Sequence, residues 1–192
     1  KYSIKTKLLI GADGRNSFIR DYYNIKTQIT DLEQKAVTFI IQHKKSHNNI
    51  SYEIYNTGGP FTTVPLKSNE EKKSAVIWVN DSLKINELLS LSKFELQGEI
   101  NKRSCDKLGK ISIISDLQIS NVNTQLADKF VDHRMILIGE AAHALPPIGA
   151  QGLNLTIKDI RLIYDLIKKF KNNVGSNEMI AEFNFKRLID VK

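Results

Sequence analysis

Glycines, an acidic side chain and a helix start lie close together between residues 134 and 159. Gly149 and Gly152 fall in a loop just before an apolar helical pattern, and Glu140 follows a short apolar run. A helix N-terminus presents unpaired backbone N–H groups and partial positive charge, which favour an anionic ligand. An ionised carboxylate only accepts hydrogen bonds, so Glu140 suits a ribose or ribitol hydroxyl. This combination predicts a site for a nucleotide-type cofactor.

A strand, a loop and a helix must position these residues. The apolar run 135–138 predicts a buried strand that ends at Gly139, and the following loop contains Pro146 and Pro147. From Leu155 onward the apolar spacing becomes helical, which predicts one buried helix face. That face comprises Leu155, Ile160, Ile163, Tyr164, Ile167 and Phe170.

A second strand and turn occur near the start of the chain. Residues 7–10 form an apolar run, and the glycines that follow permit a tight turn and close backbone approach. Asp13 can cap this turn, and residues 17–22 can begin a short helix. Taken alone, the stretch is equally consistent with an ordinary Asp-Gly turn beside a solvated Arg20.

The segment 139–154 resembles the second flavin-binding motif of the para-hydroxybenzoate-hydroxylase-like FAD monooxygenases, which opens with the residues GDAAH. Glu140 replaces the usual Asp, which keeps the charge but lengthens the side chain. With PPIGAQGLNL also present, the segment is most similar to that of the ubiquinone-biosynthesis hydroxylases. The matching residues are Gly139, Ala141, Ala142, His143, Pro147, Gly149, Gly152 and Asn154.

The turn after residue 10 resembles the DG motif of the same family, G-A-D-G-x-x-S-x-x-R. In the family this motif touches the pyrophosphate region of FAD and has been linked to NAD(P)H use. Two family motifs in the family's order make the ordinary-turn interpretation much weaker. The matching residues are Gly11, Ala12, Asp13, Gly14, Ser17 and Arg20.

The resemblance implies a monooxygenase that takes electrons from NAD(P)H and hydroxylates an aromatic ring, with a polyprenylated phenol of ubiquinone synthesis as substrate. Backbone N–H groups around Gly152, Leu153 and Asn154 would stabilise negative charge on the flavin. No catalytic base is identified, since His143 is mainly a structural position in the family. Pro65, Pro146 and Pro147 would shape the ring site. Non-covalent FAD would contact Gly11, Asp13, Gly14, Arg20, Gly139, Glu140, Gly149, Gln151, Gly152, Leu153 and Asn154.

Between the two motifs, residues 34–80 show the alternation and turn signals of antiparallel strands. We expect a mixed α/β fold, in which a partial Rossmann-like FAD-binding domain carries an inserted antiparallel substrate sheet. Residues 1–33 and 126–192 are expected to form the FAD-binding part, and residues 34–125 the sheet. Within the sheet domain, Ser92 and Glu95 form a capping box that predicts a helix to about Arg103. Residues 111–120 predict a further strand.

The chain contains no G-x-G-x-x-G segment, whose backbone would hold the ADP pyrophosphate in this family. We expect another polypeptide to supply such a βαβ unit, because strands 7–10 and 135–138 belong in a parallel sheet covered on both faces. The alternative is a non-catalytic remnant or partner subunit that retains the sheet as a binding module. The sequence leaves both interpretations open.

The composition is that of an ordinary globular protein, with 192 residues, 41% hydrophobic residues and a net charge of +7. The basic residues are dispersed, which argues against nucleic-acid binding and leaves peripheral attraction to an anionic membrane open. One cysteine, no signal peptide and no run of about 20 apolar residues indicate a cytoplasmic protein, at most peripheral on the inner membrane. His43 and His47 lack acidic or cysteine neighbours, so we expect no metal site.

Overall fold

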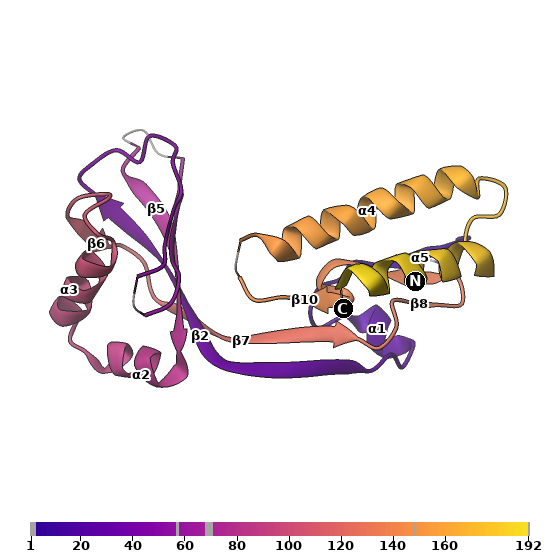
Figure 1. Cartoon of the computed structure of the whole chain (residues 1–192), viewed down its shortest axis with the longest axis horizontal. Coiled ribbons are helices and arrows are strands. Elements are labelled where there is room, and N and C mark those ends of the chain that lie inside the picture. The colour runs from indigo at the N-terminus through magenta and orange to yellow at the C-terminus, as the bar shows by residue number, and fades with distance from the viewer. Residues whose placement is uncertain (1–2, 57, 68–70, 148, 192) are drawn as a thin grey trace. The chain divides into compact units, whose positions relative to one another are not determined.

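The computed structural model describes residues 3–56, 58–67, 71–147 and 149–191 (Figure 1). The chain divides into two compact units. Unit 1 comprises residues 1–30 and 123–192, and unit 2 comprises residues 31–122. Two long strands, β2 (Thr27–His43) and β7 (Gln118–Ala127), belong partly to each unit.

Unit 1 contains a three-stranded sheet in the order β1-β9-β8. β1 is parallel to β9, with Gly11 opposite Leu137, and β8 is antiparallel to β9. The strands predicted from the apolar runs 7–10 and 135–138 are confirmed as β1 and β9. The elements of unit 1 are β1 (Leu9–Gly11), α1 (Phe18–Tyr22), β8 (Val131–Asp132), β9 (Met135–Leu137), the 3-10 turn η1 (Gly139–Ala141), β10 (His143–Ala144), α4 (Gln151–Lys169) and α5 (Asn177–Val191).

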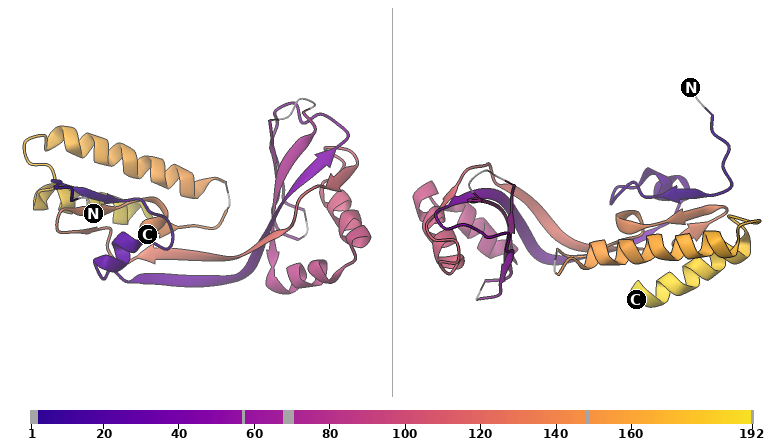
Figure 2. Two further views of the ribbon diagram at one scale, coloured as in Figure 1. Left: turned by 180° about the vertical axis from the view of Figure 1, so that it is seen from behind. Right: turned by 90° about the horizontal axis from the view of Figure 1, so that it is seen from above.

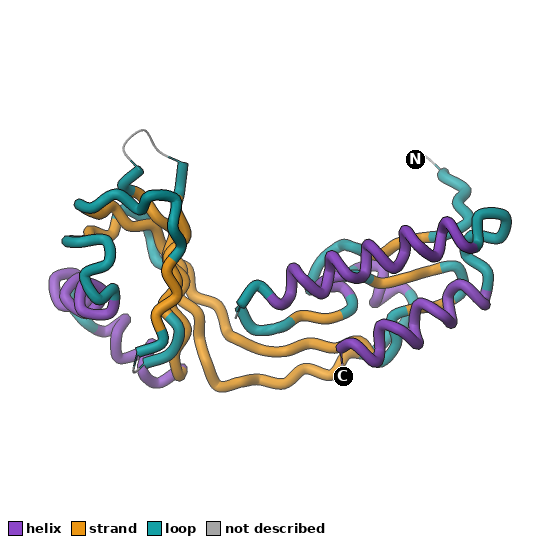
Figure 3. Tube along the Cα trace, turned by 45° about the horizontal axis from the view of Figure 1, so that its top comes forward, coloured by secondary structure: helices purple, strands orange, loops and turns teal. Residues whose placement is uncertain are grey.

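The core of unit 1 is formed by β9 and the two long helices. β9 is apolar and fully buried, as expected for a strand covered on both faces. The helices α4 and α5 lie side by side, joined by a single loop (Figures 2 and 3). They contribute Ile163, Leu166, Met179 and Phe183 to the same buried cluster as β9.

The helix after the glycine loop differs from its prediction in two respects. It begins at Gln151 rather than Leu155, because Ala150 takes a left-handed conformation (φ 52°) and its carbonyl accepts the first helical hydrogen bond. The predicted single buried face is also wrong. Ile163 and Leu166 are buried, whereas Ile160, Tyr164 and Ile167 are exposed. Apolar residues extend so far around α4 that one packing surface cannot cover them all.

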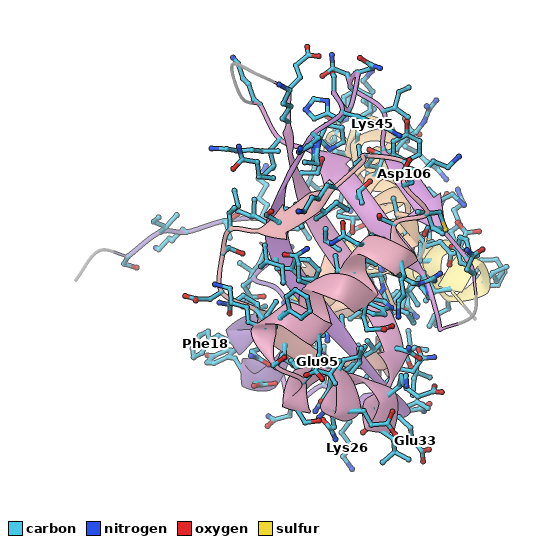
Figure 4. The ribbon with its side chains drawn as sticks, turned by 90° about the vertical axis from the view of Figure 1, so that its left-hand side faces the viewer. Phe18, Lys26, Glu33, Lys45, Glu95 and Asp106 are labelled. Carbon is cyan, nitrogen blue, oxygen red and sulfur yellow. The ribbon has the colours of Figure 1, made fainter. Side chains whose placement is uncertain are left out.

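Unit 2 is an antiparallel sheet with α2 and α3 on one face (Figures 1 and 4). In the larger sheet the strand order is β10-β7-β2-β5-β4-β3, and β6 also pairs with β2. The helices cover the face that carries Val37, Phe39 and Trp78, and Trp78 is buried as core. The remaining elements are β3 (Tyr52–Ile54), β4 (Phe61–Pro65), β5 (Lys73–Asp81), α2 (Ser82–Ser90), α3 (Lys93–Arg103) and β6 (Ile111–Ile113).

The local predictions for unit 2 have mixed outcomes. The capping box is confirmed, since Ser92 Oγ accepts the Glu95 N–H and the Glu95 carboxylate accepts the Ser92 N–H at 2.9 Å. The prediction of a single strand over residues 111–120 is wrong, because the structure has β6 at Ile111–Ile113 and β7 from Gln118 onward. The chain leaves the ladder between β6 and β7, because the Ser115 hydroxyl accepts the Ile40 N–H at 2.8 Å in place of a backbone carbonyl. One or two helices are expected in this domain, and the second is α2, which has no capping side chain to mark its position in the sequence.

Candidate functional site

The two motif loops leave the same edge of the unit 1 sheet. Because β1 and β9 are parallel and in register, their carboxyl ends lie next to each other, and Ile138 N–H donates to the Gly11 carbonyl at 3.0 Å. A Cβ at Gly11 would lie 2.8 Å from the Leu137 side chain and 3.0 Å from that of Ile19, so a larger residue here would make these two side chains shift. The edge beyond adjacent parallel strands is where open α/β sheets bind their ligands.

In the first loop, the Asp13 carboxylate accepts hydrogen bonds from other residues of the chain. Its two oxygens accept the Ser17 hydroxyl at 2.5 Å and the Ile19 N–H at 3.0 Å, and Ser17 in turn caps α1. Partial burial raises the pKa of Asp13, but these hydrogen bonds outweigh it and hold the pKa below its ordinary value. The predicted cap is confirmed, and a direct contact between Asp13 and a cofactor stays a prediction.

Arg20 connects the two loops. Its side chain is buried, and its Nη1 donates to the carbonyl of Arg15 at 2.9 Å and to that of Ala141 at 3.2 Å. These two carbonyls belong to the DG turn and to the second motif, so one guanidinium fixes their spacing. The interpretation of Arg20 as a solvated residue is wrong, and its contact with a cofactor stays a prediction.

Arg15 is a candidate that the motif did not single out. Its guanidinium lies 3.6 Å from the Glu140 carboxylate and donates to Asn123 Oδ1 at 2.9 Å. The side chains of Arg15 and Glu140 are 35% and 57% exposed, so both can reach a ligand. The only signal for Arg15 in the sequence is a basic residue at a variable position of the motif.

The second loop places Glu140 at the surface. Gly139 has a φ of +58°, and a Cβ there would lie 3.3 Å from Thr156, so glycine is needed at this turn. The turn η1 then directs Glu140 outward, while Ala141 and Ala142 are buried. An exposed carboxylate directly after a sheet strand suits the hydroxyl-binding role predicted for it.

The N-terminus of α4 offers three backbone N–H groups, those of Gln151, Gly152 and Leu153, ahead of the first helical hydrogen bond. The Asn154 N–H donates to the Ala150 carbonyl at 3.1 Å, so it already has a helical partner, and the contact of Asn154 with a cofactor stays a prediction. Helix N-termini carry partial positive charge, and α4 is 19 residues long. This end of α4 therefore fits an anionic edge of a ligand.

The remaining predicted residues are divided between the units. Pro146 and Pro147 lie in the loop between β10 and α4, and Gly149 has a left-handed conformation there (φ 57°). Pro65 belongs to unit 2, at the end of β4, where it pairs with Ser74. Their roles at a ring site or cofactor stay predictions.

The two histidines considered for metal binding form structural contacts in unit 2. Their rings lie 5.9 Å apart, and His43 bonds to the Lys45 carbonyl and to Ser74. Within the described ranges, no group of three or more His, Cys, Asp or Glu side chains is arranged to hold a metal ion. None of the helices in the described part of the chain combines the length and apolarity needed to cross a membrane.

In this chain, two parallel strands carry two loops that resemble flavin-binding motifs at one edge of a sheet. This arrangement is typical of FAD-binding domains. The FAD binding domain family matches residues 1–189, and the chain belongs to this family. The resemblance inferred from the two motifs is thereby confirmed.

Among its relatives, the ubiquinone hydroxylase UbiL of Rhodospirillum rubrum is 28% identical over 191 residues, covering 98% of this chain and 44% of UbiL. The 3-demethoxyubiquinol 3-hydroxylase of Escherichia coli is 24% identical over 190 residues, covering 97% of this chain and 48% of that enzyme. The chain thus spans less than half the length of these two relatives.

A solved structure shows the same fold. PqsL, a probable FAD-dependent monooxygenase from Pseudomonas aeruginosa, aligns with a TM-score of 0.74 at 15% identity. The alignment covers 96% of this chain and 52% of PqsL. The expected combination of a Rossmann-like FAD domain and an antiparallel sheet is confirmed at the level of fold.

Proposed function

We propose that this chain is part of an FAD-dependent, NAD(P)H-using monooxygenase that hydroxylates an aromatic ring. The observation that carries the proposal is the joining of the two flavin motifs, through the parallel pair β1–β9 and through the hydrogen bond from Arg20 to Ala141. The names of the relatives in Rhodospirillum rubrum and Escherichia coli support a substrate of ubiquinone biosynthesis, which we infer to be a polyprenylated phenol.

The residues present fit one part of an FAD molecule. The exposed Glu140 carboxylate offers an acceptor for a ribityl hydroxyl, and the N–H groups of residues 151–153 favour the negatively charged edge of the flavin ring. Bound FAD would supply electron transfer and oxygen activation. The chain's own task is then to bind and orient the ring and to exclude water, with Pro146 and Pro147 shaping the ring site.

We assign residues 1–33 and 126–192 to FAD binding and residues 34–125 to substrate binding. The two compact units support this assignment, because their boundaries at residues 30/31 and 122/123 lie within three residues of the proposed ones. Each unit also has its own apolar core, built around β9 in unit 1 and around the β2–β5–β4 sheet in unit 2. The net charge of +7 supports a peripheral position at an anionic membrane, where a polyprenylated substrate resides.

A further polypeptide segment with a G-x-G-x-x-G turn would complete the cofactor site. An exposed apolar stripe on α4 supports this partner, because exposed helical stripes of this kind normally pack against another element. Its residues recur at intervals of four and three along one helix face, which is the spacing of a packing seam. They are Leu153, Ile157, Ile160, Tyr164 and Ile167.

The alternative function is a non-catalytic binding module. The observation that favours it is that the sheet of unit 2 forms a compact unit with an apolar core of its own. The module would retain the substrate-type sheet of unit 2 and bind a partner or a quinone precursor without oxidising it.

Retention of FAD by the purified chain separates the two functions. The chain is mixed with FAD and passed through gel filtration, and the visible spectrum of the protein peak is recorded. We expect flavin bands that are shifted from those of free FAD. Glu140→Gln is expected to weaken FAD binding by about tenfold, since a hydrogen bond to a charged group contributes about 1.5 kcal/mol or more.

The matched control is Glu99→Gln, which changes an exposed carboxylate of α3 in unit 2 and should leave FAD binding unchanged. Absence of FAD from the protein peak, both for the chain alone and after addition of a separately produced G-x-G-x-x-G segment, would contradict the monooxygenase proposal. That result would favour the binding module.

A further inference from the structure

A buried cluster of charged side chains lies between the second motif loop and the two long helices of unit 1. Asp159 of α4, His143 of β10 and Arg187 of α5 are each 2% exposed or less. Asp159 Oδ2 accepts the His143 Nε2–H at 2.8 Å and the Gly139 N–H at 3.0 Å. Asp159 Oδ1 accepts Arg187 Nε–H at 2.5 Å. One carboxylate thus joins three separate segments of the chain.

A buried charged cluster is weak evidence for a stabilising role. Desolvation of buried charges costs several kcal/mol, and a buried ion pair can often be replaced by apolar side chains without loss of stability. The surroundings are already apolar, with Phe130 5.9 Å from the His143 ring and Phe183 fully buried nearby in the core. A buried charged cluster in such a core is therefore better explained by the positions of the segments that it holds together.

The contacts of Asp159 connect the second motif to the helix α4. Gly139 and His143 are the two ends of the segment that opens the second motif, and Glu140 lies between them. Asp159 itself is eight residues after the first residue of α4, which is just over two helical turns. The carboxylate therefore sets the segment that carries Glu140 against the helix whose N-terminus carries the N–H groups of residues 151–153.

Asp159 holds the two ends of the segment Gly139–His143, whereas Arg20 holds its middle through the Ala141 carbonyl. Among the described residues, His143 Nδ1 has no hydrogen-bond partner, so the contact to Asp159 is the polar contact that orients this ring. Arg187 holds the other carboxylate oxygen and is itself fixed by Asp190 at 2.5 Å and by the Leu155 carbonyl at 3.3 Å. Through Arg187, the helix α5 supports the loop from behind.

We propose that Asp159 is a positioning residue for the cofactor, which holds the segment Gly139–His143 at a set place relative to the N-terminus of α4. Arg187 is the second positioning residue, acting through Asp159. The link to a cofactor rests on the proposed flavin function, whereas the control of the loop conformation by Asp159 can be measured without any ligand.

The test is amide hydrogen exchange of the 192-residue chain, wild type against Asp159→Asn. Asparagine keeps the shape but cannot accept from Gly139, His143 and Arg187 together, because one of its two terminal atoms is a donor. We expect exchange of residues 139–143 to accelerate by about 10- to 100-fold, corresponding to the loss of a hydrogen bond to a charged group. Exchange of the β9 amides should rise much less, because the change is local.

Phe183→Leu is the matched control, since it destabilises the same core but leaves every polar group of the cluster in place. Its effect should be uniform over β9 and residues 139–143. If Asp159→Asn gives the same uniform pattern as Phe183→Leu, the residue is merely structural and the proposal is overturned. If Asp159→Asn does not fold, Arg187→Lys is tested instead, because lysine keeps the charge but cannot make all the contacts of the guanidinium. The proposal requires that Arg187→Lys also accelerates amide exchange of residues 139–143 locally, by a smaller factor.

FAD binding distinguishes this proposal from the proposed function. Under conditions where both variants are folded, Asp159→Asn should weaken FAD binding by about tenfold, and Phe183→Leu should leave it within about twofold of wild type. If the wild-type chain binds no FAD while the exchange result is as expected, the flavin function fails and the positioning of the loop stands. Equal FAD affinity of Asp159→Asn and wild type would overturn the cofactor role.

Discussion

At the scale of single residues, charged side chains around the motif loops have two kinds of role. Arg20 and Asp13 are bonded to groups of the chain itself, and both hold the turn that follows β1. Arg15 and Glu140 form a long, partly exposed ion pair, which adds little to stability. Substitution of Arg20 or Asp13 therefore changes the loop as well as any ligand contact, whereas substitution of Arg15 or Glu140 tests ligand binding more directly.

His43 gives unit 2 a pH dependence. Burial lowers the pKa of His43 and the neighbouring His47 lowers it further, against the hydrogen bond to the Lys45 carbonyl, so its pKa lies below the ordinary value of 6.5. The folded state thus favours the neutral ring. This contribution to stability is complete above the unfolded-state pKa, and it is lost as the pH falls from there through the folded-state pKa.

We therefore expect unit 2 to lose stability as the pH falls below about 7.5, and we expect His43→Gln to reduce this pH dependence because the amide does not titrate. Urea unfolding followed by fluorescence of Trp78, the only tryptophan of the chain, measures it. His133→Gln, at an exposed position of unit 1, is the control and should retain the wild-type slope. An unchanged slope in His43→Gln would show that other groups carry the pH dependence.

At the scale of elements, α4 is the helix whose two apolar faces have different functions. One face packs into the unit 1 core through Ile163 and Leu166. The other face carries the exposed stripe from Leu153 to Ile167. Burial of an apolar side chain contributes roughly 25 cal/mol per Å² removed from water, and only the first face obtains that contribution in this chain.

Two identical substitutions three residues apart test this assignment. Ile163→Ala should lower the free energy of unfolding by about 2–5 kcal/mol, since Ile163 is 6% exposed and the change leaves a cavity. Ile160→Ala should change it by less than about 0.5 kcal/mol, since Ile160 is 53% exposed. Urea unfolding followed by circular dichroism gives both values.

A large loss for Ile160→Ala would mean that the stripe is covered in solution. Light scattering during gel filtration would then show whether a second copy of the chain covers it, because self-association at this seam would raise the molar mass above that of the 21.8 kDa chain.

At the scale of the whole molecule, three buried apolar clusters are divided between the two units. The cluster around β9 belongs to unit 1, and the clusters around Trp78 and Val79 belong to unit 2. The units are linked by the long strands β2 and β7. Small single cores unfold in one cooperative step, but a chain whose buried clusters are divided between two units need not do so.

We expect two transitions in urea, seen as a difference between the Trp78 fluorescence curve and the circular dichroism curve, to which α4 and α5 contribute strongly. FAD at about a hundred times its dissociation constant should stabilise only the transition of unit 1, by about 2.7 kcal/mol. Coincident curves that shift together with FAD would mean that β2 and β7 couple the two units into one cooperative structure.

Much of the local structure could be predicted, because caps and strand–loop–helix transitions depend on neighbouring residues. The capping box of α3 and the short helix after the Asp-Gly turn followed from local residue types, and the strands β1 and β9 followed from their apolar runs. The break between β6 and β7 could not, because it depends on Ser115 reaching Ile40, which is 75 residues away in sequence.

The sequence by itself determined the family and the identity of the two motif loops, since both are continuous stretches whose residue types act locally. The tertiary structure alone decided which face of α4 is buried, that Arg20 reaches Ala141 across 121 residues, and that Asp159 meets Arg187 across 28. The physical reason is that these contacts depend on the register of β1 against β9 and on the packing of α4 against α5. Neither is encoded in the spacing of any one segment.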